Sequence, residues 1–72
     1  MSHESYRCIV ILHQQYRPES FRKKIKNSGI KVYSTWRVFP FLTVQLADFE
    51  LKYLRSFEEV KDIRISTKDE NT

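Results

Sequence analysis

The sequence is short of the residues on which several kinds of protein depend. It has one cysteine, Cys8, so no disulfide can form within the chain, and one glycine, Gly29, so no glycine-rich loop can hold a phosphate. Two prolines and 40% hydrophobic residues are typical of a folded chain. The longest apolar run, residues 8–12, is too short to span a bilayer, and residues 1–7 lack a signal-peptide pattern. We therefore expect a soluble, cytoplasmic protein.

The sequence also lacks the residue patterns of an enzyme or a metal site. Cys8 lies between apolar residues of a predicted strand, which favours a buried, unreactive thiol. His13 has no cysteine or histidine at metal-ligand spacing, and Glu58 and Glu59 stand beside Lys61 as ordinary surface charges. The sequence therefore predicts no catalytic residues, no metal and no cofactor.

What the sequence does contain is a succession of strand and helix patterns. The first of these patterns is at residues 6–13, where apolar side chains fall on both sides of the predicted strand, which indicates a central strand. Pro18 and Gly29 are typical of a helix start and a helix end. The predicted elements are a strand at 6–13, a helix within 16–29, two strands within 29–46, a helix within 47–60 and a strand at 60–66. Residues 1–72 then form one domain, in which 1–5 and 67–72 are predicted to be flexible tails.

This order, β-α-β-β-α-β, predicts a ferredoxin-like α+β fold. Right-handed crossovers place both helices on one face of a four-stranded antiparallel sheet whose first and third strands are central. The residues expected under the helices are Cys8, Val10, Leu12, Trp36, Leu42, Val44, Leu46, Ile63 and Ile65. The open face is expected to show Ile9, Ile11, Tyr33, Phe41 and Thr43. A contiguous patch of apolar and aromatic side chains on a charged protein usually marks a binding surface.

The net charge of +4 and the pI of about 9.4 raise the alternative of a nucleic-acid-binding module. The basic residues are spread along the chain except in residues 22–26, which we interpret as the solvated face of the first helix. RNA-recognition modules need a glycine-containing motif in the third strand, and FPFLTVQL has none. A second alternative is a dimerising domain whose open faces pair with each other.

Four segments of the chain resemble the subtilisin-type propeptides, the family of protease-propeptide inhibitors. They are RCIVILHQ, GIKVYSTW, FLTVQLADFELKYLRS and EEVKDIRIS, and the resemblance covers residues 6–72. Family members typically contain a Y-I-V strand, a G-x-x-V strand, an x-L-x-x-L helix and a final V-x-x-V. The corresponding residues here are Ile9 with Val10, Gly29 with Val32, Leu51 with Leu54, and Val60 with Ile63.

The resemblance implies an inhibitor, and by the same binding mode a folding chaperone, of a subtilisin-like serine protease. Such domains lay the open sheet face on two surface helices of the protease and run the C-terminal tail through the active-site cleft like a cleaved product. The chain would be free-standing, monomeric when free and heterodimeric with the protease. The resemblance implies a contact face of Ile9, Ile11, Tyr33, Phe41, Thr43 and Ser66. The inhibitory tail would be Lys68, Asp69, Glu70, Asn71 and Thr72.

The sequence departs from the family at two places. Counted from Val60, Thr72 takes the place of the residue before the scissile bond, and Asp69 lies three residues earlier, where subtilisins usually prefer an apolar side chain. Asp69 and Glu70 therefore imply a partner with a basic or altered cleft. Many members also have acidic residues after the last strand, and here those places hold Arg64, Ile65 and Ser66, of which Ser66 is able to accept N–H bonds.

Overall fold

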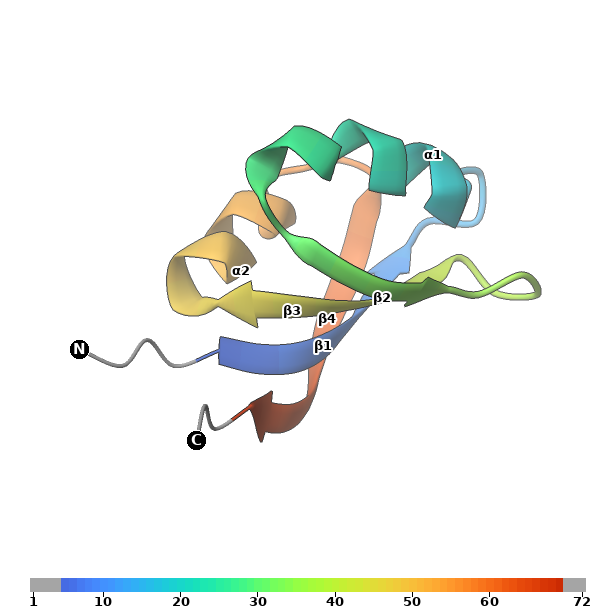
Figure 1. Ribbon diagram of the computed structural model, residues 1–72. Coiled ribbons are helices and arrows are strands. Elements are labelled where there is room, and N and C mark those ends of the chain that lie inside the picture. The colour runs from blue at the N-terminus through green and yellow to red at the C-terminus, as the bar shows by residue number, and fades with distance from the viewer. Residues whose placement is uncertain (1–4, 70–72) are drawn as a thin grey trace.

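The computed structural model describes residues 5–69, which form four strands and two helices (Figure 1). The elements follow the predicted β-α-β-β-α-β order, with a short 3₁₀ turn after the first helix. Their bounds are β1 Ser5–Leu12, α1 Pro18–Lys24, η1 Lys26–Ser28, β2 Lys31–Thr35, β3 Phe41–Ala47, α2 Asp48–Arg55 and β4 Val60–Asp69.

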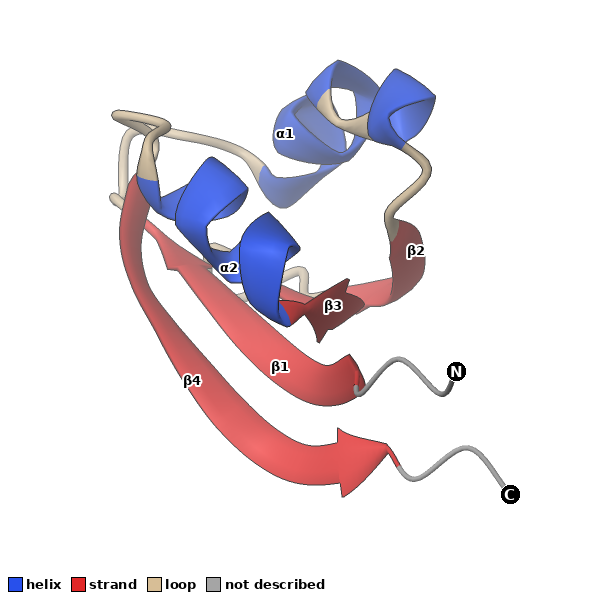
Figure 2. Cartoon of the chain, turned by 90° about the vertical axis from the view of Figure 1, so that its left-hand side faces the viewer, coloured by secondary structure: helices blue, strands red, loops and turns tan. Residues whose placement is uncertain are grey.

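The strands form one antiparallel sheet in the order β2-β3-β1-β4. As predicted, β1 and β3 are central, because each helix connects two strands that lie on either side of a third. Figure 2 shows both helices on the same face of the curved sheet, and the opposite face has no helix over it. The predicted ferredoxin-like α+β fold is therefore confirmed.

The hydrophobic core lies between the sheet and the two helices. Alternate residues of β1 and β3 supply its floor, since neighbouring residues of a strand point to opposite faces. Phe21 and Ile25, four residues apart, supply the buried stripe of the first helical segment, and Leu54 supplies that of α2. The buried residues are Cys8, Val10, Leu12, Phe21, Ile25, Ile30, Leu42, Val44, Leu46, Leu54 and Ile63.

Local signals set the ends of the helices. Pro18 occupies the first turn of α1, where its missing N–H costs no hydrogen bond. Gly29 ends η1 with a φ of 83°, in the left-handed region that glycine adopts without strain. At the start of α2, the Ala47 N–H donates to Glu50 Oε1 at 2.9 Å. Ala47 is the cap position, and Asp48 is the first residue of α2.

The strands at the two chain ends differ from their predicted bounds: β1 lies one residue earlier, with the same length, and β4 is longer. Ser5 belongs to β1, and β4 continues three residues past the predicted end, with Tyr6 opposite Lys68 and Ser5 opposite Asp69. Residues 67–69 are therefore part of the sheet rather than a flexible tail, because the start of β1 provides backbone groups for them to pair with. Residues 1–4 and 70–72 lie outside the described part of the chain. Within residues 5–69, no helix has the length and apolar character to cross a membrane.

Candidate protein-interaction surface

The open face of the sheet is centred on β1 and β3. Their antiparallel register places Ile9 opposite Thr43 and Ile11 opposite Phe41, so that four of the predicted contact residues are direct neighbours. Each of these side chains is half-buried, whereas the intervening residues of both strands are buried under the helices. The structure therefore brings together the central part of the predicted contact face.

Tyr33 lies on this face, as predicted, and is the site of a β-bulge in β2. Val32 lies opposite Val44 and Ser34 lies opposite Thr43, so Tyr33 is the extra residue between them. Its hydroxyl donates to Gln45 Oε1 at 2.9 Å, and Gln45 Nε2 donates to Ser5 Oγ at 2.8 Å. These two hydrogen bonds connect β2, β3 and β1 across the open face and fix the position of Tyr33.

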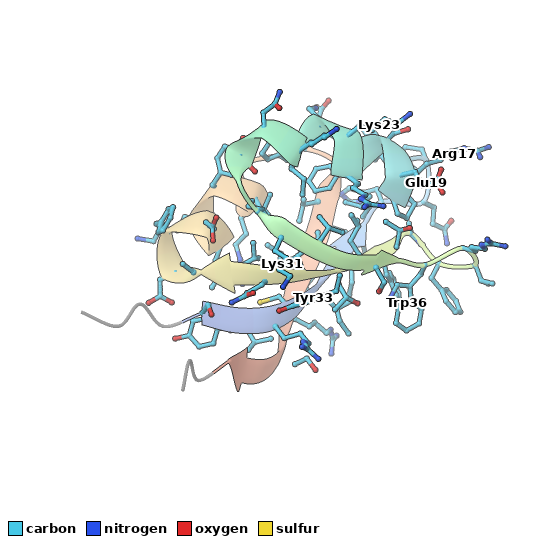
Figure 3. All side chains as sticks on the ribbon, viewed as in Figure 1. Arg17, Glu19, Lys23, Lys31, Tyr33 and Trp36 are labelled. Carbon is cyan, nitrogen blue, oxygen red and sulfur yellow. The ribbon has the colours of Figure 1, made fainter. Side chains whose placement is uncertain are left out.

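The same bulge corrects the expected position of Trp36. An extra residue exchanges the two sides of a strand for every residue that follows it. Ser34 therefore shares the open face with Thr43, Thr35 lies opposite Leu42, and Trp36 follows on the open side. Its side chain is 43% exposed, and its Nε1 donates to Thr43 Oγ1 at 3.4 Å. Figure 3 shows Trp36 on the side of the sheet away from the helices.

Trp36, Phe39 and Phe41 form what we call the aromatic cluster. The Trp36 and Phe41 rings meet edge to face with centroids 5.6 Å apart, and the Phe39 and Phe41 rings stack at 5.3 Å. Phe39 is 51% exposed. The strand pattern did not predict this cluster, because Phe39 lies in the β2–β3 connection, outside either alternation. The sequence signal that could have indicated the cluster is the concentration of aromatic residues around Pro40.

Two expectations about β4 need correction. Ile65 lies opposite Cys8, on the side of the helices, yet it is 54% exposed because β4 is an edge strand with no neighbour beyond it. Ser66 is the extra residue of a bulge between the Cys8 and Arg7 pairings, and it is exposed. It therefore lies toward the opposite end of β1 from Ile11, away from the aromatic cluster.

The predicted inhibitory tail is divided by the structure. Lys68 and Asp69 pair with β1 as the last residues of β4, so neither belongs to an unpaired segment. Glu70, Asn71 and Thr72 lie outside the described residues. The predicted tail therefore begins within β4 and not after it.

Positive charge gathers at the end of the open face where β1 begins. Arg7 Cζ lies 4.5 Å, and Lys31 Nζ 5.2 Å, from the centroid of the Tyr33 ring (Figure 3 labels Lys31 and Tyr33). Farther along the sheet, Arg64 Nε lies 3.8 Å from Asp62 Oδ2. The described part of the open face thus has an aromatic end and a cationic end.

The one thiol of the chain is placed in the core. Cys8 is 0% exposed, its Sγ lies 3.6 Å from the Tyr6 carbonyl oxygen, and burial raises the pKa of the thiol to about 11. A thiol that stays protonated at neutral pH is a poor nucleophile. Among residues 5–69, no three histidine, cysteine, aspartate or glutamate side chains come together as metal ligands.

No family model, curated protein or solved structure matches the chain. The geometry of the open face is therefore the basis for a functional proposal.

Proposed function

We propose that this chain binds and inhibits a subtilisin-like serine protease through the open face of its sheet. The observation that supports this proposal most directly is a continuous apolar and aromatic surface on the face that no helix covers, formed by Ile9, Ile11, Trp36, Phe39 and Phe41. Such a surface on a small charged domain is typical of a protein-binding site. The same binding mode would serve a folding chaperone of that protease, and we propose the cytoplasm as the site of action.

In this proposal the open face provides affinity and the end of β4 provides the inhibitory segment. The last pairs of the sheet, Tyr6 with Lys68 and Ser5 with Asp69, lie at a sheet end, where opening costs the least free energy. Opening of these pairs would release residues 68–72 to add a strand to the edge of the protease cleft. In this proposal, Lys68 and Asp69 must therefore separate from β1 before the tail can bind the protease.

The proposal is tested with a panel of subtilisin-like serine proteases and a chromogenic peptide substrate. We expect the full chain to inhibit at least one of them, and Ile11→Glu to weaken that inhibition about tenfold or more, because a carboxylate at the centre of an interface stays unpaired. The matched control is Phe49→Glu, which places the same charge on α2 at a side chain that is 73% exposed. Circular dichroism checks that both variants are folded.

Two outcomes would contradict the sheet-face assignment: full inhibition by Ile11→Glu, or equal loss in Phe49→Glu. The tail is tested separately by deleting residues 68–72 and, in a second variant, residues 70–72. We expect the longer deletion to weaken inhibition while the circular dichroism spectrum stays that of a folded domain. Undiminished inhibition by both deletions would remove the tail from the mechanism.

The dimerising alternative concerns the same open face and gives a different result in solution. If two copies cover each other's aromatic clusters, sedimentation equilibrium will return twice the monomer mass of 8.7 kDa, and Ile11→Glu will restore the monomer. The inhibitor proposal expects the mass of a monomer for the free chain and a one-to-one complex with the protease.

A further inference from the structure

Arg7, Gln45 and Lys31 form one row across the sheet. Gln45 lies opposite Arg7 of β1 on one side and opposite Lys31 of β2 on the other. The Tyr33 hydroxyl donates a hydrogen bond to the same Gln45. The cationic groups of Arg7 and Lys31 both lie over the Tyr33 ring. Three side chains from two strands are thus held together around one glutamine. We call Arg7, Lys31 and Tyr33 the cationic clamp.

No described ion pair balances the charges of Arg7 and Lys31. The ion pairs among them are Lys24 with Glu59, on the helix side, and Arg64 with Asp62. Asp62 lies opposite Ile11, four residues along β1 from Arg7, which is about 14 Å at the rise of an antiparallel strand. A tyrosine ring attracts two cations but cannot neutralise them. Arg7 and Lys31 are therefore a preorganised pair of positive charges, and neither is in an ion pair with a described carboxylate.

We propose that the cationic clamp binds a carboxylate, and hence that the partner of the open face carries an acidic group beside the apolar area that meets the aromatic cluster. The inference rests on the proposed function, because it specifies the chemistry of the protease surface. Arg7 and Lys31 each bring donors that suit a carboxylate, and the aromatic cluster lies at the other end of the same face.

An acidic protein surface fits these side chains better than a nucleic acid does. Base stacking requires a free aromatic face, and the Tyr33 ring has two cations over it. Phe39 and Phe41 stack on each other with 17° between their planes, so each covers one face of the other. Arg7 and Lys31 stand together at one end of the open face, and the next described cation along it, Arg64, lies near Asp62 Oδ2, so these side chains do not form an unbroken track for a phosphate backbone.

The first test titrates the full chain with two probes and follows the backbone amides by NMR. The probes are an oligoglutamate peptide and an oligouridylate of equal length, at equal ionic strength. We expect saturable shifts at Arg7, Lys31 and Tyr33 with the peptide. Arg7→Gln combined with Lys31→Gln should weaken that binding about tenfold, because charge-assisted hydrogen bonds to the carboxylate are lost.

The control removes the same charge from the helix side, with Arg22→Gln combined with Lys26→Gln. No saturable shift, shifts confined to α1, or equal weakening in the control would overturn the proposal. Tighter binding of oligouridylate than of the peptide, with shifts over the aromatic cluster, would overturn it in favour of a nucleic acid.

A second test separates this inference from the proposed function. For any protease that the full chain inhibits, the clamp double variant should inhibit about tenfold less well, and inhibition should weaken with added salt. Unchanged inhibition by that variant would overturn the inference and leave the inhibitor proposal standing. If no protease is inhibited while the peptide binds at the cationic clamp, the inhibitor proposal fails and the carboxylate site remains.

Discussion

The two faces of the sheet come from alternate residues of the same strands, yet helices cover only one of them. Leu42 is 0% exposed beneath the helices, and its neighbour Phe41 is half-buried on the open face. Val10 and Ile9 differ in the same way on β1. Apolar residues on both sides of a strand therefore identify a core face and a binding face together, and the position of the helices distinguishes them.

The strongest test of this comparison truncates neighbouring residues on opposite faces. Leu42→Ala should lower the free energy of unfolding by about 2–5 kcal/mol, because it leaves a cavity beneath the helices. Thr43→Ala, one residue later on the open face, should lower it by about 1 kcal/mol or less. Urea denaturation followed by circular dichroism measures both. Equal losses would mean that the open face is packed as tightly as the core.

The two faces should also differ in the rate at which a thiol placed on each of them reacts. Cys8 is buried with a pKa raised to about 11, so a disulfide reagent at pH 8 should modify it only when the domain opens. Ile9→Cys in a Cys8→Ala background presents the thiol on the open face. It should react about tenfold faster or more, since Ile9 is only half-buried.

The pH dependence of Cys8 has a definite sign. The pKa in the folded protein lies above the ordinary value of 9.0, so the folded state keeps its proton longer than the unfolded state does. This contribution to stability is fully present below pH 9 and is lost as the pH rises toward 11. Comparison of the wild type with Cys8→Ala over this range, by urea denaturation, isolates it from other groups. A difference that does not change with pH would contradict the raised pKa.

Trp36 offers a direct check of which face it occupies. On the open face it should show the red-shifted emission of an exposed indole and efficient quenching by acrylamide, because its side chain is 43% exposed. Trp36→Ala should cost about 1 kcal/mol, the worth of its edge-to-face contact with Phe41. Blue-shifted emission that resists quenching would return Trp36 to the helix side.

The sequence was sufficient for the fold because the patterns of β1, β3 and the two helices agree with each other. Strict alternation in β3 and the apolar run of β1 identified the central strands, and Pro18 and Gly29 placed the first helical segment. It was not sufficient for the whole open face. The bulge at Tyr33 places Trp36 on the open face, and residues 31–35 contain no glycine or proline that would have indicated a bulge.

Residues 67–69 were missed for a different reason. They are polar, and polar residues at a chain end are usually assigned to a tail, whereas here pairing with β1 extends the strand. The cationic clamp likewise depends on register, because Arg7 and Lys31 are far apart in sequence and meet only through Gln45. Contacts of this kind follow from strand pairing and not from local pattern.

The smallest expected effect concerns the ion pair between Lys24 and Glu59 on the helix side of the sheet. Lys24 Nζ donates to Glu59 Oε2 and connects the end of α1 to the segment before β4. The contact raises the pKa of Lys24, and it lowers the pKa of Glu59 chiefly through the same hydrogen bond. Because the folded-state pKa of Glu59 lies below its ordinary value, its contribution is present above about pH 4.5 and is lost as the pH falls.

Lys24→Met should therefore lower stability slightly at pH 7, with a smaller difference from wild type at pH 3 or in 1 M salt, since exposed ion pairs are weak and screened. Urea denaturation at the three conditions measures this, and Lys23→Met, on the same helix without a described ion pair, is the control. A loss as large as that of Leu42→Ala would mean that a surface ion pair, and not the apolar floor, holds the helices on the sheet. A loss that is the same at pH 3 and pH 7 would assign the role of Lys24 to its ammonium over the Phe57 ring, with Nζ 5.3 Å from the ring centroid, because that charge is present at both pH values and methionine lacks it.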